Sequence, residues 1–219
     1  MKRNVNLELI NRMNQPAEKG KRILLHSCCA PCSTHVITML ANTYRVTVFY
    51  YNPNITIETE YSLRKEEQIQ LIQKFNNQTF GYPIEFLEGD YEPDLYFDQI
   101  RGNEDQPEGG KRCELCFRMR LLKTAMCAIN SDFDCFMTTL TISPLKNSDQ
   151  INGIGHEIET EVGIKYLPTD FKKGNGYLHS IELSKEYQLY RQDYCGCIYS
   201  KAEANIRKML GEQNEKITR

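Results

Sequence analysis

The chain has 219 residues, of which 40% are hydrophobic and 26% are charged, and its formal net charge at pH 7 is −2. That length suits one large globular domain, and the near-neutral charge excludes a chain that is basic over its whole surface. No apolar run approaches the ~18 residues that a membrane helix requires. The amino terminus is charged but lacks the apolar core of a secretory signal, so we expect a cytoplasmic protein without a membrane partner.

Apolar periodicity and breaker residues predict helices and strands that alternate along the chain. A short amphipathic helix is expected at 5–14, within a polar extension. The predicted strands occupy short apolar or β-branched stretches, at 22–27, 45–53, 82–91, 135–140 and 165–171. The predicted helices lie between and after them, at 33–43, 56–78, 113–129, 148–163, 177–188 and 200–210. For the helix at 56–78, the apolar residues Leu63, Ile69, Ile72 and Phe75 predict the buried face.

This order of elements predicts an α/β fold, with a mostly parallel sheet covered by helices on both faces and a helical C-terminal portion. No repeat or linker divides the chain. We therefore expect an N-terminal extension over 1–21, a single catalytic domain over 22–212 and a C-terminal tail over 213–219. Ligands of such folds bind beyond the carboxyl ends of the strands. The stretch 28–32 follows the first predicted strand and is placed at such an end.

Seven of the nine cysteines lie in three short motifs, which are Cys28-Cys29-Ala30-Pro31-Cys32, Cys113-Glu114-Leu115-Cys116 and Cys195-Gly196-Cys197. Clustered cysteines in a cytosolic protein more often bind metal or carry out redox chemistry than form structural disulfides. One close pair is readily explained as small packed residues, but three are not. The remaining two, Cys127 and Cys135, are expected to be packed thiols.

Several chemistries fit these motifs. Cys29 and Cys32, at a strand–helix junction, have the spacing of a thioredoxin-like redox motif, although one dithiol leaves the other motifs unexplained. Four thiolates would close a zinc site, but a Cys-Gly-Cys spacing is not typical of compact zinc modules. An iron–sulfur cluster also needs four thiolates, and Cys113 and Cys116 at a helix start would favour an anionic cluster.

The Cys-Gly-Cys motif has two interpretations of its own. A disulfide across one residue closes a small strained ring, and strained disulfides are the reducible kind. Alternatively, Cys195 and Cys197 complete a metal site. No glycine-rich nucleotide-binding fingerprint occurs in the chain. The stretch 138–147, which follows a predicted strand, is a further candidate for ligand binding.

Several stretches together resemble the cobalamin-independent epoxyqueuosine reductases, the QueH family. They are LLHSCCAPCS, FYYNPNI, Tyr61 to Lys65, KRCELCFRMRL, TTLTISPLKN, DFKKGNGY and LYRQDYCGCIYS, and they span most of residues 22–200. The resemblance implies an α/β fold of the adenine-nucleotide hydrolase-like (HUP-like) kind. It also implies the last step of queuosine synthesis, in which the epoxide oxygen of epoxyqueuosine at the tRNA wobble position is removed by a two-electron reduction.

The same resemblance implies the site residues. It places a [4Fe–4S] cluster on four cysteines, Cys28, Cys29, Cys113 and Cys116. It makes Cys195 and Cys197 the redox-active catalytic pair. An additional iron ion is compatible with it, and Cys32 is the candidate ligand for that iron.

A deoxygenation also requires electrons, protons and a bound anticodon loop. The physiological electron donor is left open. The candidate acids are the polar residues beside the Cys-Gly-Cys motif, Tyr190, Asp193 and Tyr194. The candidate tRNA contacts are basic residues expected around the cleft, Arg118, Arg120, Lys146, Lys172, Lys173 and Arg191. Two other functions stay open at this point: a metal-free cytosolic thiol–disulfide oxidoreductase, and a zinc-stabilised nucleic-acid-binding module without chemistry.

Overall fold

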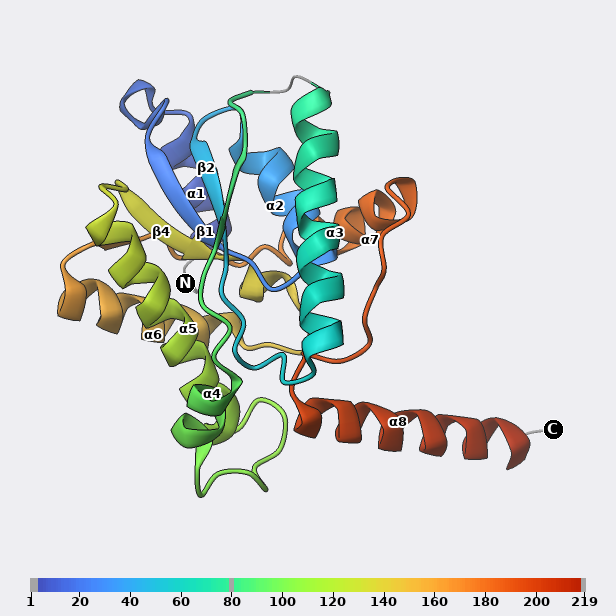
Figure 1. The fold of residues 1–219 in the computed structure, drawn as a ribbon. Coiled ribbons are helices and arrows are strands. Elements are labelled where there is room, and N and C mark those ends of the chain that lie inside the picture. The colour runs from blue at the N-terminus through green and yellow to red at the C-terminus, as the bar shows by residue number, and fades with distance from the viewer. Residues whose placement is uncertain (1–3, 79–80, 218–219) are drawn as a thin grey trace.

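The computed structural model describes residues 4–78 and 81–217, with side chains through residue 210. Its sheet has five strands, β1 (Arg22–His26), β2 (Arg45–Tyr50), β3 (Glu85–Glu88), β4 (Cys135–Thr138) and β5 (Lys165–Tyr166). Every pairing between them is parallel, and their order is β3-β2-β1-β4-β5. The predicted parallel α/β sheet is therefore confirmed (Figure 1).

The helices follow the predicted order with one addition. They are α1 (Val5–Met13), α2 (Ala30–Leu40), α3 (Glu58–Asn77), α4 (Pro93–Ile100), α5 (Lys111–Asn130), α6 (Ser148–Val162), α7 (Gly176–Glu186) and α8 (Ile198–Ile217). Two 3₁₀ turns, η1 (Pro16–Glu18) and η2 (Thr139–Ile142), join them. The sequence analysis missed α4, a short helix that begins at Pro93, where the fixed φ of proline favours a helix start.

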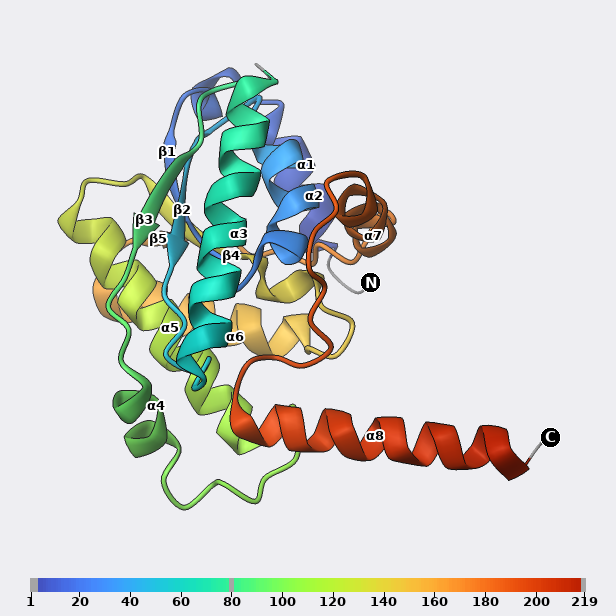
Figure 2. The same cartoon turned by 45° about the vertical axis from the view of Figure 1, so that its right-hand side comes forward.

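Helices cover both faces of the sheet, as predicted. One apolar layer joins Ile23 and Leu25 of β1 to α1, α2 and α3. The other joins Leu24 of the same strand to α5 and α6. Because both faces are buried, β1 is apolar at consecutive positions rather than at alternate ones. Figure 2 shows α2, α3 and α7 on one side of the sheet and α5 and α6 on the other.

The buried face of α3 differs from the predicted apolar face. Leu63 is 45% exposed, whereas Arg64 and Gln68 have no exposed surface. The side chains of Arg64 and Gln68, one turn apart, face the carboxyl edge of the sheet, where both have partners. The buried face of α3 is therefore turned away from Leu63. Ile72 and Phe75 are buried as expected.

The segment before β1 is attached to the rest of the fold. Leu9 of α1 belongs to the core layer that contains α2 and α3. Glu18 forms ion pairs with Arg12 and Lys21 and accepts a hydrogen bond from Tyr44. Residues 4–21 are thus anchored by one apolar contact and one buried carboxylate.

The last helix, α8, extends away from the body of the molecule in both views (Figures 1 and 2). Only its first turns are buried, through Ser200 and Ala204, while Ile206 and Met209 are more than half exposed. None of the helices in residues 4–78 and 81–217 is long and apolar enough to cross a membrane.

Candidate metal centre

The centre forms where β1, β2 and β4 end. The pairing register sets His26 of β1 beside Phe49 and Thr138 of the neighbouring strands. The chain order reverses between β1 and β4, and at such a point the loops diverge and leave room for a ligand. Cys28 leaves the sheet at this place, two residues after the end of β1.

Three thiols meet in this loop and the first turn of α2. The Sγ atoms of Cys28, Cys29 and Cys32 all lie within 4.8 Å of one another. Cys28 and Cys29 are buried, and Cys32 is half-buried. Thiolates bound to one tetrahedral ion at ~2.3 Å stand about 3.8 Å apart, which is the distance between the Sγ atoms of Cys28 and Cys29 (3.8 Å). This group could hold a metal ion, and it includes Cys32.

Charge and burial make the three thiols unequal. Hydrogen bonds from Cys29 and Cys32 lower the pKa of the Cys28 thiol, and Arg120 and Lys146 add to that effect. Burial raises the pKa of Cys29 to about 12. One thiolate supported by two thiols is the arrangement expected of closely spaced sulfurs without a metal, since neighbouring thiolates repel.

The second motif begins α5. Cys113 lies in the first turn and Cys116 one turn further on. The backbone N–H of Gly109 donates to Cys113 Sγ (3.3 Å), and Arg120 Nη1 donates to Cys116 Sγ (3.9 Å). Cys113 packs against the apolar layer that contains Cys28 and Cys29. The two α5 cysteines do not belong to the tight group of three found among the described residues.

The third motif is held by α3. Arg64 Nη1 donates to the carbonyl oxygen of Cys195 (3.1 Å), and Glu60 pairs with the same guanidinium. Gly196 has a φ of +138°, and a Cβ there would lie 2.8 Å from Cγ1 of Ile55. Glycine is therefore required for the turn that presents the two sulfurs. Cys195 and Cys197 are both thiols in this structure.

Cys197 also begins α8. The backbone N–H of Ser200 donates to its Sγ atom (3.3 Å), so the sulfur acts as the acceptor that caps the helix. Cys197 is buried in one apolar cluster with Cys116, Tyr96 and Ile100. The second and third motifs are thereby brought together.

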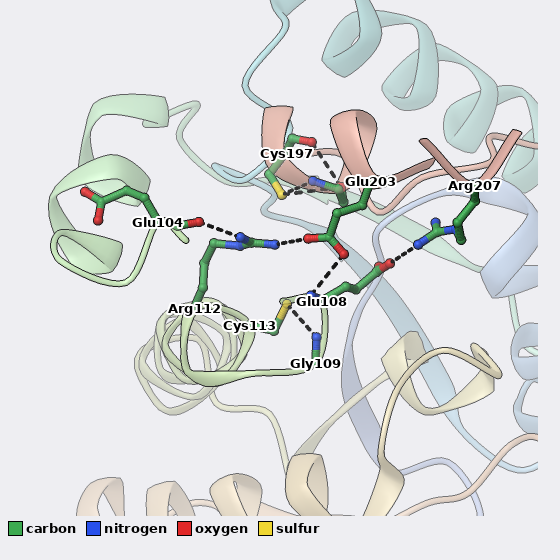
Figure 3. A network of polar contacts seen from close by, with 9 residues as sticks. Glu104, Glu108, Gly109, Arg112, Cys113, Cys197, Glu203 and Arg207 are labelled. Atoms are coloured by element: carbon green, nitrogen blue, oxygen red, sulfur yellow. Dashed lines mark hydrogen bonds and ion pairs between the residues drawn. The ribbon is translucent and has the colours of Figure 1, made fainter. Parts of the chain in front are cut away.

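A network of charged groups ties these two motifs to each other (Figure 3). Arg112, beside Cys113, pairs with Glu203 of α8 (2.7 Å). Glu203 also accepts from the backbone N–H of Glu108 (3.1 Å), and the Glu108 carboxylate pairs with Arg207 (3.3 Å). The loop that precedes α5 is thus fastened to the first turns of α8.

A cavity of about 220 Å³ opens onto the sulfurs. Cys28, Cys32 and Cys195 line it together with Lys146 and Glu108. Among the described residues, none pairs with the Lys146 ammonium. Burial lowers the pKa of Lys146, but the nearby Cys195, Cys28 and Cys32 raise it by more, so its pKa is raised overall. The positively charged Lys146 ammonium therefore lines the same cavity as the sulfurs of Cys28, Cys32 and Cys195.

The structure separates the predicted basic residues into different environments. Lys146 and Arg191 line the cavity, and Lys172 and Lys173 line a neighbouring hollow that Lys146 joins to it. Arg118 is paired with Glu157 and Glu161 on the α6 side.

Arg120 has no exposed surface, so the prediction that it contacts RNA is wrong. Arg120 lies on the inward face of α5, and charge alone does not distinguish that face from the surface.

The three candidate acids also differ. Asp193 and Tyr194 line the cavity, whereas Tyr190 does not. Lys208 pairs with Asp193 and lowers the pKa of its carboxyl. Burial raises the pKa of Tyr194, which keeps its hydroxyl protonated.

Sequence reasoning missed Arg64, Asn52, Glu108 and Glu203. Asn52 and Arg64 do lie in stretches that carry the family resemblance, and Arg64 and Gln68 stand one turn apart on an otherwise apolar helix face.

The residues present suit an anionic metal–sulfur group. Seven cysteines surround one edge of the sheet, and the buried guanidinium of Arg120 donates to Cys116, His26 and Asn52. Among the described residues no carboxylate pairs with it, although a buried cation is stable only with a counter-charge. Metal-bound thiolates would supply that negative charge.

The chain is similar to a family of known proteins over most of its length. The family model of "Epoxyqueuosine reductase QueH" matches residues 23–203. The relative from Streptococcus pyogenes serotype M1 is 48% identical over 178 residues, covering 81% of this chain and 69% of the relative. Relatives from Histophilus somni (41%; 90% and 79% covered) and Staphylococcus epidermidis (39%; 91% and 84% covered) carry the same name, epoxyqueuosine reductase QueH.

Proposed function

The chain belongs to the epoxyqueuosine reductase QueH family, and on that premise we propose that it reduces the epoxide of epoxyqueuosine in tRNA to the alkene of queuosine. The observation that carries the proposal is the group of three thiols, two buried and one half-buried, at the carboxyl edge of the sheet, in a chain that the family model matches over 23–203. A metal-free thiol–disulfide oxidoreductase does not account for seven cysteines at one edge. A tRNA substrate also implies that the enzyme acts in the cytoplasm.

We assign Cys28, Cys29, Cys113 and Cys116 as the ligands of a [4Fe–4S] cluster, with Cys32 as the ligand of an additional iron. When bound, the cluster would supply electrons for the reduction. The N–H group of Gly109 and the guanidinium of Arg120 already donate to Cys113 and Cys116, respectively. Burial raises the pKa of both thiols, and these donors oppose that effect in favour of the thiolate form that binds iron.

The reaction consumes two electrons and two protons, breaks both carbon–oxygen bonds of the epoxide and releases the oxygen as water. Cys195 and Cys197 are assigned as a pair that supplies two electrons when their thiols form a disulfide. Their position agrees with this role, since Cys195 lines the cavity and Gly196 gives the tight turn that a ring across one residue needs.

Two side chains of the cavity suit the departing oxygen. Tyr194 keeps its proton and lies beside the Cys-Gly-Cys motif, so it is the preferred donor among the candidate acids. The Lys146 ammonium is placed to hold the oxygen as negative charge develops on it. Asp193, already paired with Lys208, is ionised and is a poorer proton donor.

The tRNA would approach from the open side of the cavity. Lys146 and Arg191 line that cavity, and the neighbouring hollow carries Lys172 and Lys173. A wobble base splayed out of its loop would enter the cavity, while the lysines bind the adjoining phosphates.

Anaerobic purification and reconstitution test the assignment. We expect a brown protein with iron and sulfide in comparable amounts and with single-turnover conversion of epoxyqueuosine-containing tRNA. Cys28→Ala should lose most of the iron and all conversion, while the matched control Cys127→Ala, at the edge of the α5–α6 layer, should keep both. A colourless protein that reduces disulfides, or a colourless zinc protein, would contradict the proposal.

A further inference from the structure

We propose that Arg120 is a positioning residue whose buried positive charge raises the reduction potential of the metal–sulfur group on the neighbouring cysteines. This inference rests on the proposed function in one respect, namely that the thiols hold an iron–sulfur cluster. It concerns a residue of this chain that touches neither substrate nor solvent, and it assigns to that residue an electrostatic role.

The guanidinium of Arg120 is fixed by three different elements. It donates from Nε to His26 Nε2 at the end of β1 (3.2 Å), and from Nη2 to Asn52 Oδ1 after β2 (2.6 Å). It donates from Nη1 to Cys116 Sγ, one turn earlier on α5 (3.9 Å). Because a guanidinium is planar and rigid, these contacts set the distance between its charge and the sulfur.

None of these partners neutralises the charge. His26 cannot neutralise the charge, because an imidazole is either neutral or cationic, and its Nε2 lies 3.2 Å from Nε of Arg120 and 3.2 Å from the carbonyl oxygen of Tyr51. Asn52 is neutral as well. Arg64, the other fully buried arginine of this region, differs because Glu60 pairs with it. Among the described residues, Cys116 is the only partner of Arg120 that can carry negative charge, and Cys28 and Cys195 lie near enough to act on it electrostatically.

The guanidinium of Arg120, which has no carboxylate partner among the described residues, does not stabilise the oxidised and reduced forms of the metal–sulfur group equally. Reduction of the cluster by one electron adds one negative charge next to the guanidinium. The more negative, reduced form is therefore stabilised more than the oxidised form, and the potential rises. Since arginine does not lose its proton in proteins, the effect is independent of pH in the working range.

Three variants separate the charge of Arg120 from its geometry. In Arg120→Gln the charge is lost, whereas Arg120→Lys keeps the charge and loses the planar fork. The matched control Arg118→Gln removes an arginine of the same helix that pairs with Glu157 and Glu161. After reconstitution, iron content and the midpoint potential are measured by anaerobic redox titration followed by electron paramagnetic resonance. We expect a lower midpoint in Arg120→Gln, and midpoints close to wild type in Arg120→Lys and Arg118→Gln.

A fourth variant covers the case in which Arg120→Gln fails to take up iron. Asn52→Asp retains Arg120 and places a carboxylate on it, at the cost of the hydrogen bond from Asn52 Nδ2 to the carbonyl of Ser27 (2.9 Å). Its midpoint should also fall. An unchanged midpoint in either neutralised variant, or loss of iron from Arg120→Lys, overturns the role of Arg120. Absence of iron from reconstituted wild-type protein would instead overturn the proposed function.

Discussion

Glycine at position 196 fulfils two requirements at once. Its φ of +138° is unfavourable for any residue with a side chain, and Ile55 and Asn54 occupy the space where a Cβ would stand. The turn therefore exists only because no side chain is present. Cys195 and Cys197 flank this turn.

Gly196→Ala should destabilise the fold by about 2 kcal/mol or more, because it combines backbone strain with a steric clash. Urea unfolding followed by circular dichroism measures this. The control is Gly153→Ala in α6, where no atom lies within 4 Å of the added methyl group. That control should be neutral or stabilising, since alanine favours a helix over glycine. Equal stability of the two variants would show that the turn at Gly196 is not constrained.

At this scale the sequence indicated which cysteines matter but not how they group. The motif spacing paired Cys29 with Cys32, and the family resemblance grouped Cys28 with Cys29, whereas the fold brings all three sulfurs within 4.8 Å of one another. Cys32 enters because α2 starts at Ala30, so that its first turn directs this side chain back to the loop. Helix starts are local details that spacing in a sequence does not determine.

At the scale of elements, α5 and α8 are joined through their first turns. Arg112 is almost fully buried, and Glu203 is its carboxylate partner. The Arg112–Glu203 ion pair links the motif at Cys113–Cys116 to the motif at Cys195–Cys197. Because the partners come from segments far apart in the chain, the sequence offered no sign of it.

Glu203→Ala should lower the free energy of unfolding by about 2 kcal/mol, because it leaves the buried Arg112 without its counter-ion. We also expect faster proteolysis within the loop 101–110, which loses the hydrogen bond from the Glu108 N–H to Glu203 and keeps its ion pair with Arg207. Thermal unfolding and limited proteolysis check both effects. Glu114→Gln, which alters a more exposed pair with Lys111, serves as the control and should change stability by less than about 0.5 kcal/mol. Similar losses in the two variants would contradict the role given to Glu203.

The N-terminal segment makes its own contribution. We propose that residues 4–21 act as part of the catalytic domain, because Leu9 and Glu18 are buried against it. Burial opposes ionisation of Glu18, but hydrogen bonds from Arg12, Lys21 and Tyr44 prevail and lower the pKa of its carboxyl to about 2.

A carboxyl with a lowered pKa in the folded state stabilises the fold above its unfolded pKa and loses this effect as the pH falls. Glu18 should therefore contribute fully above about pH 5–6, and its contribution should fade as the pH approaches 2. Glu18→Gln should lower the unfolding temperature most at pH 7 and distinctly less near pH 3. Scanning calorimetry at the two pH values measures the difference, and a pH-independent effect would argue against this ion pair.

At the scale of the whole molecule, the net charge of −2 conceals a local concentration of cations beside the cavity. Binding of tRNA should weaken as salt rises, since each phosphate contact releases counterions. Lys173→Ala should reduce the slope of log K against log salt by about 0.7, because this exposed lysine lines the hollow next to the cavity. Lys65→Ala, which removes the partner of Glu88 elsewhere on the surface, should leave the slope unchanged. Filter binding over a salt series tests both, and salt-independent binding would refute the tRNA interface.

The sheet and its flanking helices were predictable because their apolar pattern is strong and regular. The features that the sequence did not predict are those that depend on tertiary contacts. The short helix α4 has a weak pattern, and the interior position of Arg120 follows from packing of α5 against the sheet. Charge in a sequence does not distinguish an arginine that faces solvent from one that faces a buried sulfur.

The cysteines of the candidate centre come from three segments that are widely separated along the chain. On the ribosome, Cys28 and Cys29 emerge early, while Cys195 and Cys197 emerge only after the last strand has been made. A metal ion that bound to the chain during synthesis would have only some of its ligands available. Under the proposed ligand assignment, the complete site therefore assembles after the sheet has folded, and the metal binds to an already folded chain.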